Sequence, residues 1–269
     1  TATLAWGVNL PAHAVIIKGT QLYDPQKGDF VDLGILDVLQ IFGRAGRPQY
    51  ETHGEGIIIT SHTNLAKYLA AITQQTPIES QFLHSLADNL NAEINLGTVS
   101  TILEAVNWMK YTYCYLRMKR NPMVYGITYQ ELEQDQSLNS HLESLLKAAA
   151  NRLQSLGLIG YDSKNGLMKI KDLGRIASLF YLKNETIEIF SKFLKPSMSE
   201  AEIFSMVSKA VEFDNLKVRD SETQDLERLS LSTLVPVKDD IHSVPGKVNL
   251  LMQAFISRSR IDDFTLISD

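Results

Sequence analysis

The stretch that most constrains the fold is residues 40–48, which read Gln-Ile-Phe-Gly-Arg-Ala-Gly-Arg-Pro. Apolar residues precede it at helical spacing, so the sequence predicts a helix over residues 33–42 with one face packed on a core. Gly43 and Gly46 allow close approach of backbone or ligand, and Pro48 ends any helix. The chain must therefore pass from a packed helix into a tight loop that carries two arginines.

Arg44 and Arg47 lie three residues apart in this loop. Two guanidinium groups on one surface repel each other unless an anion lies between them, and their planar forks suit phosphate oxygens. The alternative is an ordinary pair of surface arginines bound to neighbouring carboxylates. The spacing alone is therefore a hint of a phosphate site.

Two β-branched runs flank the helix, Ala14–Ile17 and Gly56–Ile59, and predict strands buried on both faces of a parallel sheet. Residues 1–76 are therefore expected to be α/β, with an exposed loop at residues 24–29. Loops at the ends of parallel strands form ligand crevices, which places residues 40–47 well for chemistry.

The first twelve residues, Thr-Ala-Thr-Leu-Ala-Trp-Gly-Val-Asn-Leu-Pro-Ala, and residues 40–49 together resemble the last two conserved motifs of superfamily II helicases of the large DExH type. The resemblance covers essentially the whole chain and is strongest for the two-cassette members of that family. Further stretches that carry it are residues 54–60, 77–80, 90–94 and 172–178. Two branches are candidates: residues 41–42 and 53–56 are closer to a coactivator-complex branch, and residues 194–196 and 235–238 to a spliceosomal branch.

In that family the first motif touches the nucleic-acid backbone and couples it to the ATP site. The resemblance therefore implies that Thr1, Thr3, Gly7 and Asn9 contact RNA or DNA. From the residues alone, Thr3 and Asn9 could equally cap a helix.

The second motif faces the γ-phosphate of ATP in that family. By resemblance, Gln40, Gly43, Arg44 and Arg47 bind ATP. Arg47 is then the expected arginine finger and Arg44 its companion, and Gln40 contacts the γ-phosphate or orients the attacking water.

The sequence contains no G-x-x-x-x-G-K-[S/T] loop and no Asp-Glu-x-His stretch, and Gly246-Lys247-Val248 lacks the hydroxyl residue of such a loop. We therefore expect ATP and Mg²⁺ to be bound mainly by a first RecA-like domain missing from this sequence, so that the chain alone hydrolyses nothing. The resemblance implies a 3′-to-5′ helicase that is nuclear, with the cytoplasm as a further location, and part of a larger complex, with no membrane association. The alternative is a non-catalytic platform that binds partner proteins.

Residues 77–181 predict three helices, Glu79–Leu90, Thr101–Arg120 and Leu138–Leu156, followed by a hairpin that turns at Asn165-Gly166. This order indicates a winged helix. Such domains often read DNA grooves, but residues 77–180 hold ten Lys and Arg against ten Asp and Glu. The balanced charge argues against DNA reading, and the resemblance implies a domain that braces the motor.

One face of the predicted helix Thr101–Arg120 carries Trp108, Tyr111, Tyr115 and Met118, a pattern more typical of core than of base stacking. Its basic end carries Arg117, Lys119 and Arg120. These cations suit the helix dipole, and they are also the best candidates for a local phosphate contact.

Residues 182–269 predict only helices and resemble the start of a Sec63-type helical domain, whose ratchet helix would follow Asp269. The predicted signals are a cap at Asn184, capping-box spacing of Ser199 with Glu202, and a connector over residues 230–244. The fold class is therefore multidomain α/β plus α.

Bulk composition adds limits. The net charge of −5 does not predict a tight nucleic-acid binder. Cys114 is the single cysteine, so an internal disulfide is excluded, and it is expected to be a buried hydrophobe. The six histidines form no metal-binding motif, and no apolar run is long enough to span a membrane.

Overall fold

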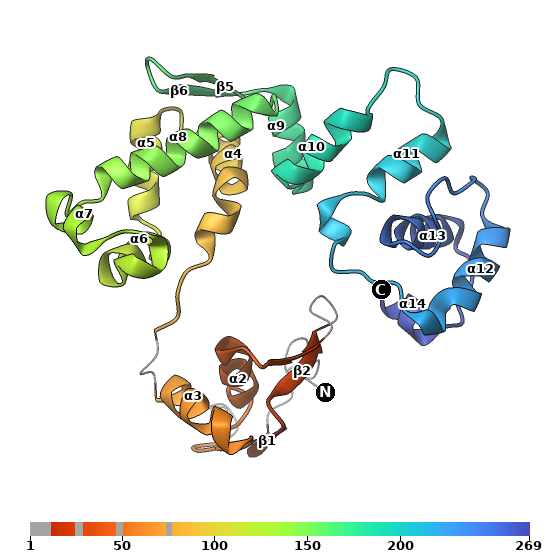
Figure 1. The fold of residues 1–269 in the computed structure, drawn as a ribbon, viewed down its shortest axis with the longest axis horizontal. Coiled ribbons are helices and arrows are strands. Elements are labelled where there is room, and N and C mark those ends of the chain that lie inside the picture. The colour runs from red at the N-terminus through yellow and green to blue at the C-terminus, as the bar shows by residue number, and fades with distance from the viewer. Residues whose placement is uncertain (1–11, 25–28, 47–50, 74–76) are drawn as a thin grey trace. The chain divides into compact units, whose positions relative to one another are not determined.

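The computed structural model describes residues 12–24, 29–46, 51–73 and 77–269, and it divides into two compact units, residues 1–78 and 79–269 (Figure 1). Among the described residues, the N-terminal unit has one buried apolar cluster and the C-terminal unit has two. No helix among the described residues is long and apolar enough to cross a membrane.

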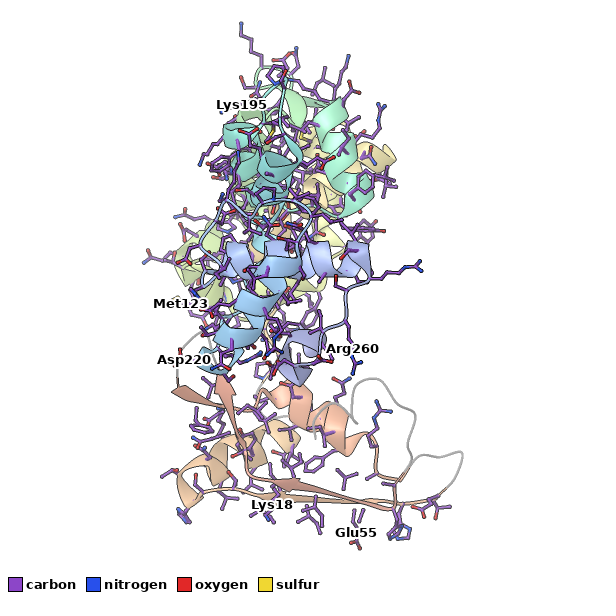
Figure 2. All side chains as sticks on the ribbon, turned by 90° about the vertical axis from the view of Figure 1, so that its right-hand side faces the viewer. Lys18, Glu55, Met123, Lys195, Asp220 and Arg260 are labelled. Carbon is purple, nitrogen blue, oxygen red and sulfur yellow. The ribbon has the colours of Figure 1, made fainter. Side chains whose placement is uncertain are left out.

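The N-terminal unit is α/β. Its described elements are β1 (Ala14–Lys18), β2 (Gln21–Asp24), β3 (Asp29–Asp32), α2 (Ile35–Phe42), β4 (Glu55–Ile59) and α3 (His62–Ile72). Strands β1 and β4 pair in parallel with Ala14 opposite Glu55, as the β-branched runs predicted. Figure 2 labels Lys18, the last residue of β1, and Glu55, the first of β4, which mark opposite ends of this pair.

One face of the β1–β4 pair is covered by α2 and α3. Ile17 and Val38 are buried there with Tyr68, whose hydroxyl donates to the Leu33 and Thr20 carbonyls at 3.1 and 3.2 Å. The prediction of burial on both faces is wrong for the described residues. Ile16, Ile57 and Ile59 are 60, 43 and 53% exposed, because alternate side chains point to the face that α2 and α3 do not cover.

Residues 25–28 of the predicted loop at residues 24–29 lie outside the described residues, but the strands on either side of them pair, which the sequence pattern did not reveal. Strands β2 and β3 pair antiparallel, with Gln21 opposite Asp32. Asp32 accepts hydrogen bonds from Lys67 at 2.8 Å and Asn64 at 2.9 Å, and the bond from Lys67 above all lowers the pKa of its carboxyl. The β2–β3 pair is thus tied to α3.

The C-terminal unit begins with helices around one large core. Its first elements are α4 (Leu86–Leu96), α5 (Ile102–Lys110), α6 (Tyr113–Arg120), α7 (Tyr129–Gln134), α8 (Asn139–Ser155), β5 (Ile159–Asp162), β6 (Leu167–Ile170) and α9 (Asp172–Phe180). The hairpin β5–β6 and the capping box of Thr101 with Glu104 are confirmed. The first predicted helix instead starts at Leu86, after a 3-10 turn over Phe82–Ser85, and α7 was missed.

The predicted helix Thr101–Arg120 is two helices. The first ends at Lys110, and Thr112 is the N-cap of the second: its hydroxyl accepts from the Tyr115 amide at 3.2 Å and donates to the Met109 carbonyl at 2.7 Å. The break moves Tyr111 out of the predicted core face, and it is 93% exposed. Met118 is buried, and Trp108 and Tyr115 pack against the core as predicted.

The remaining elements are helical, as predicted. They are α10 (Asn184–Phe193), α11 (Glu200–Val207), α12 (Thr223–Ser232), α13 (Val244–Ser257) and α14 (Phe264–Ser268). The Ser199–Glu202 capping box is confirmed. Asn184 is not the cap of α10: its backbone and side-chain N–H groups both donate to Asp88 at 2.8 and 3.1 Å, which ties α10 to α4.

A buried lysine organises the last helices. Lys247 in α13 is fully buried and donates to Glu222, Asp269 and the Lys217 carbonyl, each at 2.6 Å. Gly246 and Lys247 thus lie inside a helix and form no phosphate loop.

Candidate nucleotide-binding edge

The end of α2 presents the first predicted site residues at the surface. Ile41 and Phe42 pack against the core of the N-terminal unit, while Gln40 and Gly43 are exposed. Arg44, in the turn that follows, is half-buried. Gln40, Gly43 and Arg44 therefore lie together at one edge of the unit.

Backbone hydrogen bonds fix residues 43–46, called the arginine loop below, beside β1. The Ala12 amide donates to the Arg44 carbonyl at 3.1 Å, and the Gly46 amide donates to the Ala12 carbonyl at 3.0 Å. Ala45 forms a parallel bridge with Ala12, two residues before β1 begins. The loop thus extends the sheet at the amino end of β1, which holds Arg44 on a defined backbone.

Gly46 is required by a close crossing of two backbones. Its φ is +59°, and a Cβ added there would lie 2.4 Å from the Gly54 amide nitrogen. A Cβ on Gly54 would lie 2.3 Å from the Gly46 nitrogen, so neither residue tolerates a side chain. Gly43 ends α2 with a φ of −60°, a value that does not require glycine. The prediction that a ligand approaches Gly43 closely stays a prediction.

Arg47, Thr1, Thr3, Gly7 and Asn9 lie outside the residues that the structure describes. Their predicted roles at the γ-phosphate and on nucleic acid therefore stay predictions.

The carboxyl ends of β1 and β4 lie at the opposite edge of the strand pair from the arginine loop. A pocket of about 380 Å³ opens there, and Thr20, Phe30, Thr60 and Asn64 are among its lining residues. Thr20 and Thr60 are joined by a hydrogen bond of 2.7 Å between their hydroxyls. Ligand crevices in parallel sheets form at the carboxyl ends of the strands. The arginine loop precedes β4 and so lies at the amino end, so the prediction that such a crevice holds it is wrong. The order helix, loop, strand was the signal that could have shown this.

Two histidines flank the arginine loop. The His13 ring lies 2.8 Å from the Glu51 carboxylate and edge-on to the His53 ring, 5.2 Å between centroids. Both rings are exposed. No group of three or more metal-ligating side chains occurs in the part of the chain that the structure describes.

The basic end of α6 does not offer Arg117 to phosphate. Its guanidinium is bound by both oxygens of Glu79, at 2.7 and 3.1 Å, and its side chain is only 8% exposed. The pairing partner lies 38 residues away in sequence, which is why spacing could not reveal it. Lys119 and Arg120 remain exposed.

Glu79 is the centre of this cluster. Arg117, Asn121 and Tyr125 all donate to its carboxylate, the last two at 2.8 and 2.9 Å. These hydrogen bonds, that from Arg117 above all, lower the pKa of Glu79 to about 2. Burial, with Glu79 beside it, raises the pKa of Tyr125 to about 12. The cluster therefore holds a fixed ion pair.

Comparison with known families defines the class of the C-terminal unit. Residues 79–155 match the winged helix-turn-helix domain family, and residues 170–269 match the Sec63 Brl domain family. The chain thus carries a winged helix followed by a Sec63 Brl domain.

Over its whole length the chain is homologous to large helicases, which confirms the resemblance drawn from its motifs. It is 53% identical over 270 residues to activating signal cointegrator 1 complex subunit 3 of Rattus norvegicus, and 53% identical to the Homo sapiens protein of that name. It is 52% identical over 269 residues to the U5 small nuclear ribonucleoprotein 200 kDa helicase of Drosophila melanogaster. Each match covers 100% of this chain and 12 or 13% of the relative.

Proposed function

We propose that this chain is the C-terminal part of one cassette of an ATP-dependent nucleic-acid helicase. Residues 1–76 would be the C-terminal part of its second RecA-like domain, residues 77–181 its winged helix and residues 182–269 the start of its Sec63-type helical domain. The observation that carries the proposal is that the whole chain is 53 and 52% identical to two relatives, the second of which is named as a helicase. ATP, Mg²⁺ and the partner RecA-like domain would be supplied by the longer protein.

Within this proposal the arginine loop closes over the γ-phosphate. Arg47, Arg44 and Gln40 would stabilise charge on the transferring phosphoryl group and orient water. The exposed Gln40 and the backbone-anchored Arg44 support this assignment. Thr1, Thr3, Gly7 and Asn9 would contact RNA or DNA, so that strand binding and closure of the ATP site are coupled. The names of the relatives favour the nucleus and membership of a larger complex.

The test is Arg47→Ala in the complete protein. We expect nucleic-acid-stimulated ATP turnover to fall by about 10³-fold or more while nucleotide affinity is largely kept, because an arginine finger acts mainly in the transition state. Arg228→Ala, an exposed arginine of α12, is the matched control. Unchanged turnover in Arg47→Ala removes Arg47 from the role.

The runner-up function is a non-catalytic platform that binds partner proteins. The intact Gln40, Arg44 and Arg47 favour an active cassette over this platform. Titration of the complete protein with a fluorescent ATP analogue separates the two functions. Absence of nucleotide binding supports the platform.

A further inference from the structure

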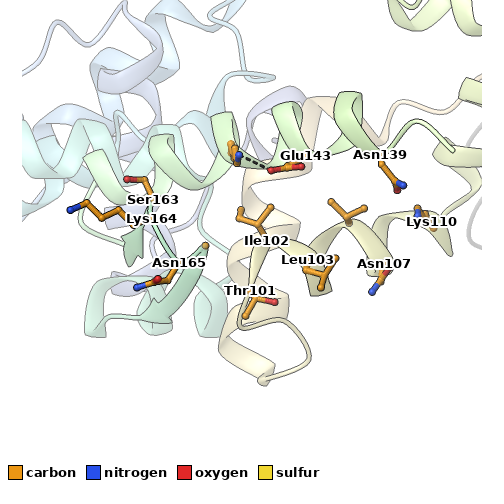
Figure 3. Close-up of a pocket in the computed structure, with 13 residues that line it drawn as sticks. Thr101, Ile102, Leu103, Asn107, Lys110, Asn139, Glu143, Ser163, Lys164 and Asn165 are labelled. Atoms are coloured by element: carbon orange, nitrogen blue, oxygen red, sulfur yellow. Dashed lines mark ion pairs between the residues drawn. The ribbon is translucent and has the colours of Figure 1, made fainter. Parts of the chain in front are cut away.

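A groove of about 620 Å³ opens on the winged helix between α5, α8 and the β5–β6 turn (Figure 3). Two helix stripes face it: Leu103, Asn107 and Lys110 from α5, and Asn139, Glu143 and Lys147 from α8. In the view of Figure 3, Ser163–Asn165 close one end, and Lys110 and Asn139 lie at the other.

The walls of this groove are held in place by the backbone. The Ile102 amide donates to the Gly166 carbonyl at 2.9 Å, and the Met168 amide donates to the Ser100 carbonyl at 2.8 Å. The turn is braced by Asp162, which accepts from the Lys164 amide at 3.0 Å. The groove is thus formed before any ligand arrives, which reduces the entropic cost of binding.

The charge of the groove is positive. Three lysines line it, Lys110, Lys147 and Lys164, against one carboxylate, Glu143. Glu143 lies 2.6 Å from the Lys147 ammonium group. Neither Lys110 nor Lys164 forms an ion pair with a described residue. This excess is local, in a chain whose net charge is −5.

The neighbouring carboxylates are already engaged. Glu104 accepts hydrogen bonds from Ser100 and Thr101 at the start of α5. Asp162 accepts from the Lys164 amide and, at 2.7 Å, from the Asn165 side chain. The Glu104 and Asp162 carboxylates therefore hold the frame of the groove and form no ion pair with Lys110 or Lys164, while Lys147 is paired with Glu143.

We propose that this groove binds the sugar–phosphate backbone of a nucleic-acid strand. Lys110, Lys147 and Lys164 contact phosphates, and the exposed amides of Asn107 and Asn139 donate hydrogen bonds to phosphate oxygens. The inference rests on the proposed helicase function for the presence of a strand. It adds a backbone contact, outside the motor, to a domain that the sequence assigned only to bracing.

The lining favours nucleic acid over an acidic peptide. Peptide recognition commonly uses apolar anchors in pockets, and acidic motifs are commonly bound by arginine clusters. In this lining Leu103, 71% exposed, is the one large apolar side chain exposed, and no arginine is present. No aromatic side chain lines the groove, so it offers no base-stacking platform. A backbone contact without sequence reading is what this arrangement supports.

The length of the groove sets the size of the ligand. The nine residues of α5 span about 13 Å. At a rise of about 3.4 Å per nucleotide, the groove covers roughly four nucleotides of one strand. Three lysines are therefore enough to contact most of the phosphates within it.

The test is fluorescence anisotropy of a labelled 12-nucleotide uridine RNA and a 12-base-pair duplex, measured against salt with the 269-residue chain. The triple variant Lys110→Gln, Lys147→Gln and Lys164→Gln is compared with the charge-matched control Lys183→Gln, Lys192→Gln and Lys195→Gln. We expect the groove variant to weaken binding about tenfold or more at 50 mM salt. The slope of log affinity against log salt should fall by about one for each phosphate that a lysine no longer neutralises. The control should stay within about twofold of the unaltered chain.

Glu143→Gln provides a test of opposite sign. Because this change removes the one carboxylate of the lining, it should tighten binding, whereas Lys147→Gln alone should weaken it. Equal behaviour of the groove and control triple variants overturns the proposal. A groove variant that no longer binds a 12-residue polyglutamate but keeps its RNA affinity overturns it in favour of an acidic peptide.

The groove proposal and the proposed role of Arg47 in ATP hydrolysis can be contradicted independently of each other. RNA binding by this chain requires no hydrolysis. Lost turnover in Arg47→Ala with no effect of the groove variant overturns the groove alone. Weakened binding by the groove variant with unchanged turnover in Arg47→Ala overturns the arginine-finger assignment alone and upholds the groove.

Discussion

Single residues in this chain owe their state to partners far away in sequence. Arg117 looked like a surface cation, but Glu79 binds it bidentately from 38 residues away. Lys247 belongs to a run with two features of a phosphate loop, yet it is fully buried against Glu222 and Asp269. Burial of a charge is tolerated only with such partners, so these residues are structural.

Glu79→Gln should destabilise the C-terminal unit by about 2 kcal/mol at pH 7, because it leaves Arg117 buried without its charge partner. The pKa of Glu79 is lowered from 4.5 to about 2. A lowered folded-state pKa contributes stability that is present above pH 4.5 and is lost as the pH falls towards 2. Urea unfolding at pH 7, 4 and 3 should therefore show the difference between the two proteins shrinking. A difference that is constant with pH would contradict this account of the ion pair.

At the scale of helices and strands, local hydrogen bonds set the boundaries. Thr101, Thr128 and Ser199 each close a capping box with a glutamate three residues on, and two of these boxes were legible in the sequence. Thr112 acts by the same chemistry, but it lies inside a continuous apolar pattern and was missed. A good cap therefore overrode the periodicity.

The packing of α9 on α4 depends on Gly174. A Cβ there would lie 2.2 Å from the Leu158 carbonyl oxygen and 2.8 Å from Asn91 Oδ1, whose amide group donates to the Gly174 carbonyl at 2.9 Å. Gly174→Ala should lower the free energy of unfolding by about 3 kcal/mol, since this overpacking outweighs the gain of about 1 kcal/mol in helix propensity.

Gly160→Ala is the control for that change. The nearest atom to its added Cβ is 3.8 Å away, so we expect a change of less than about 0.5 kcal/mol. Thermal or urea unfolding of both variants provides the measurement. Equal changes in the free energy of unfolding for the two substitutions would contradict the close contact at Gly174 as the cause of its destabilisation.

At the scale of the whole molecule, the chain consists of two units with separate cores. The large cluster from Leu86 to Ile187 lies entirely within residues 79–269. In the N-terminal unit the core centres on Tyr68, and one face of the β1–β4 pair leaves its isoleucines exposed.

Residues 79–269 should therefore fold when expressed alone. We expect a cooperative thermal transition and a helical circular dichroism spectrum, because the core of that unit needs no residue of the first 78. Glu79 must be kept at the start, since it holds Arg117. A chain of these residues that shows no cooperative transition contradicts the division into two units.

The amino-acid sequence by itself determined the parallel strands, the β5–β6 hairpin, two capping boxes, the all-helical end and the helicase family. These features depend on residues within a few positions of each other, or on long motifs read directly. Only the tertiary structure decided that β1 and β4 are covered on one face and that Arg117 is paired with Glu79. It also assembled the lysines of the groove from residues 110, 147 and 164. Charge pairing and burial act through space, and spacing along the chain does not encode which distant groups meet.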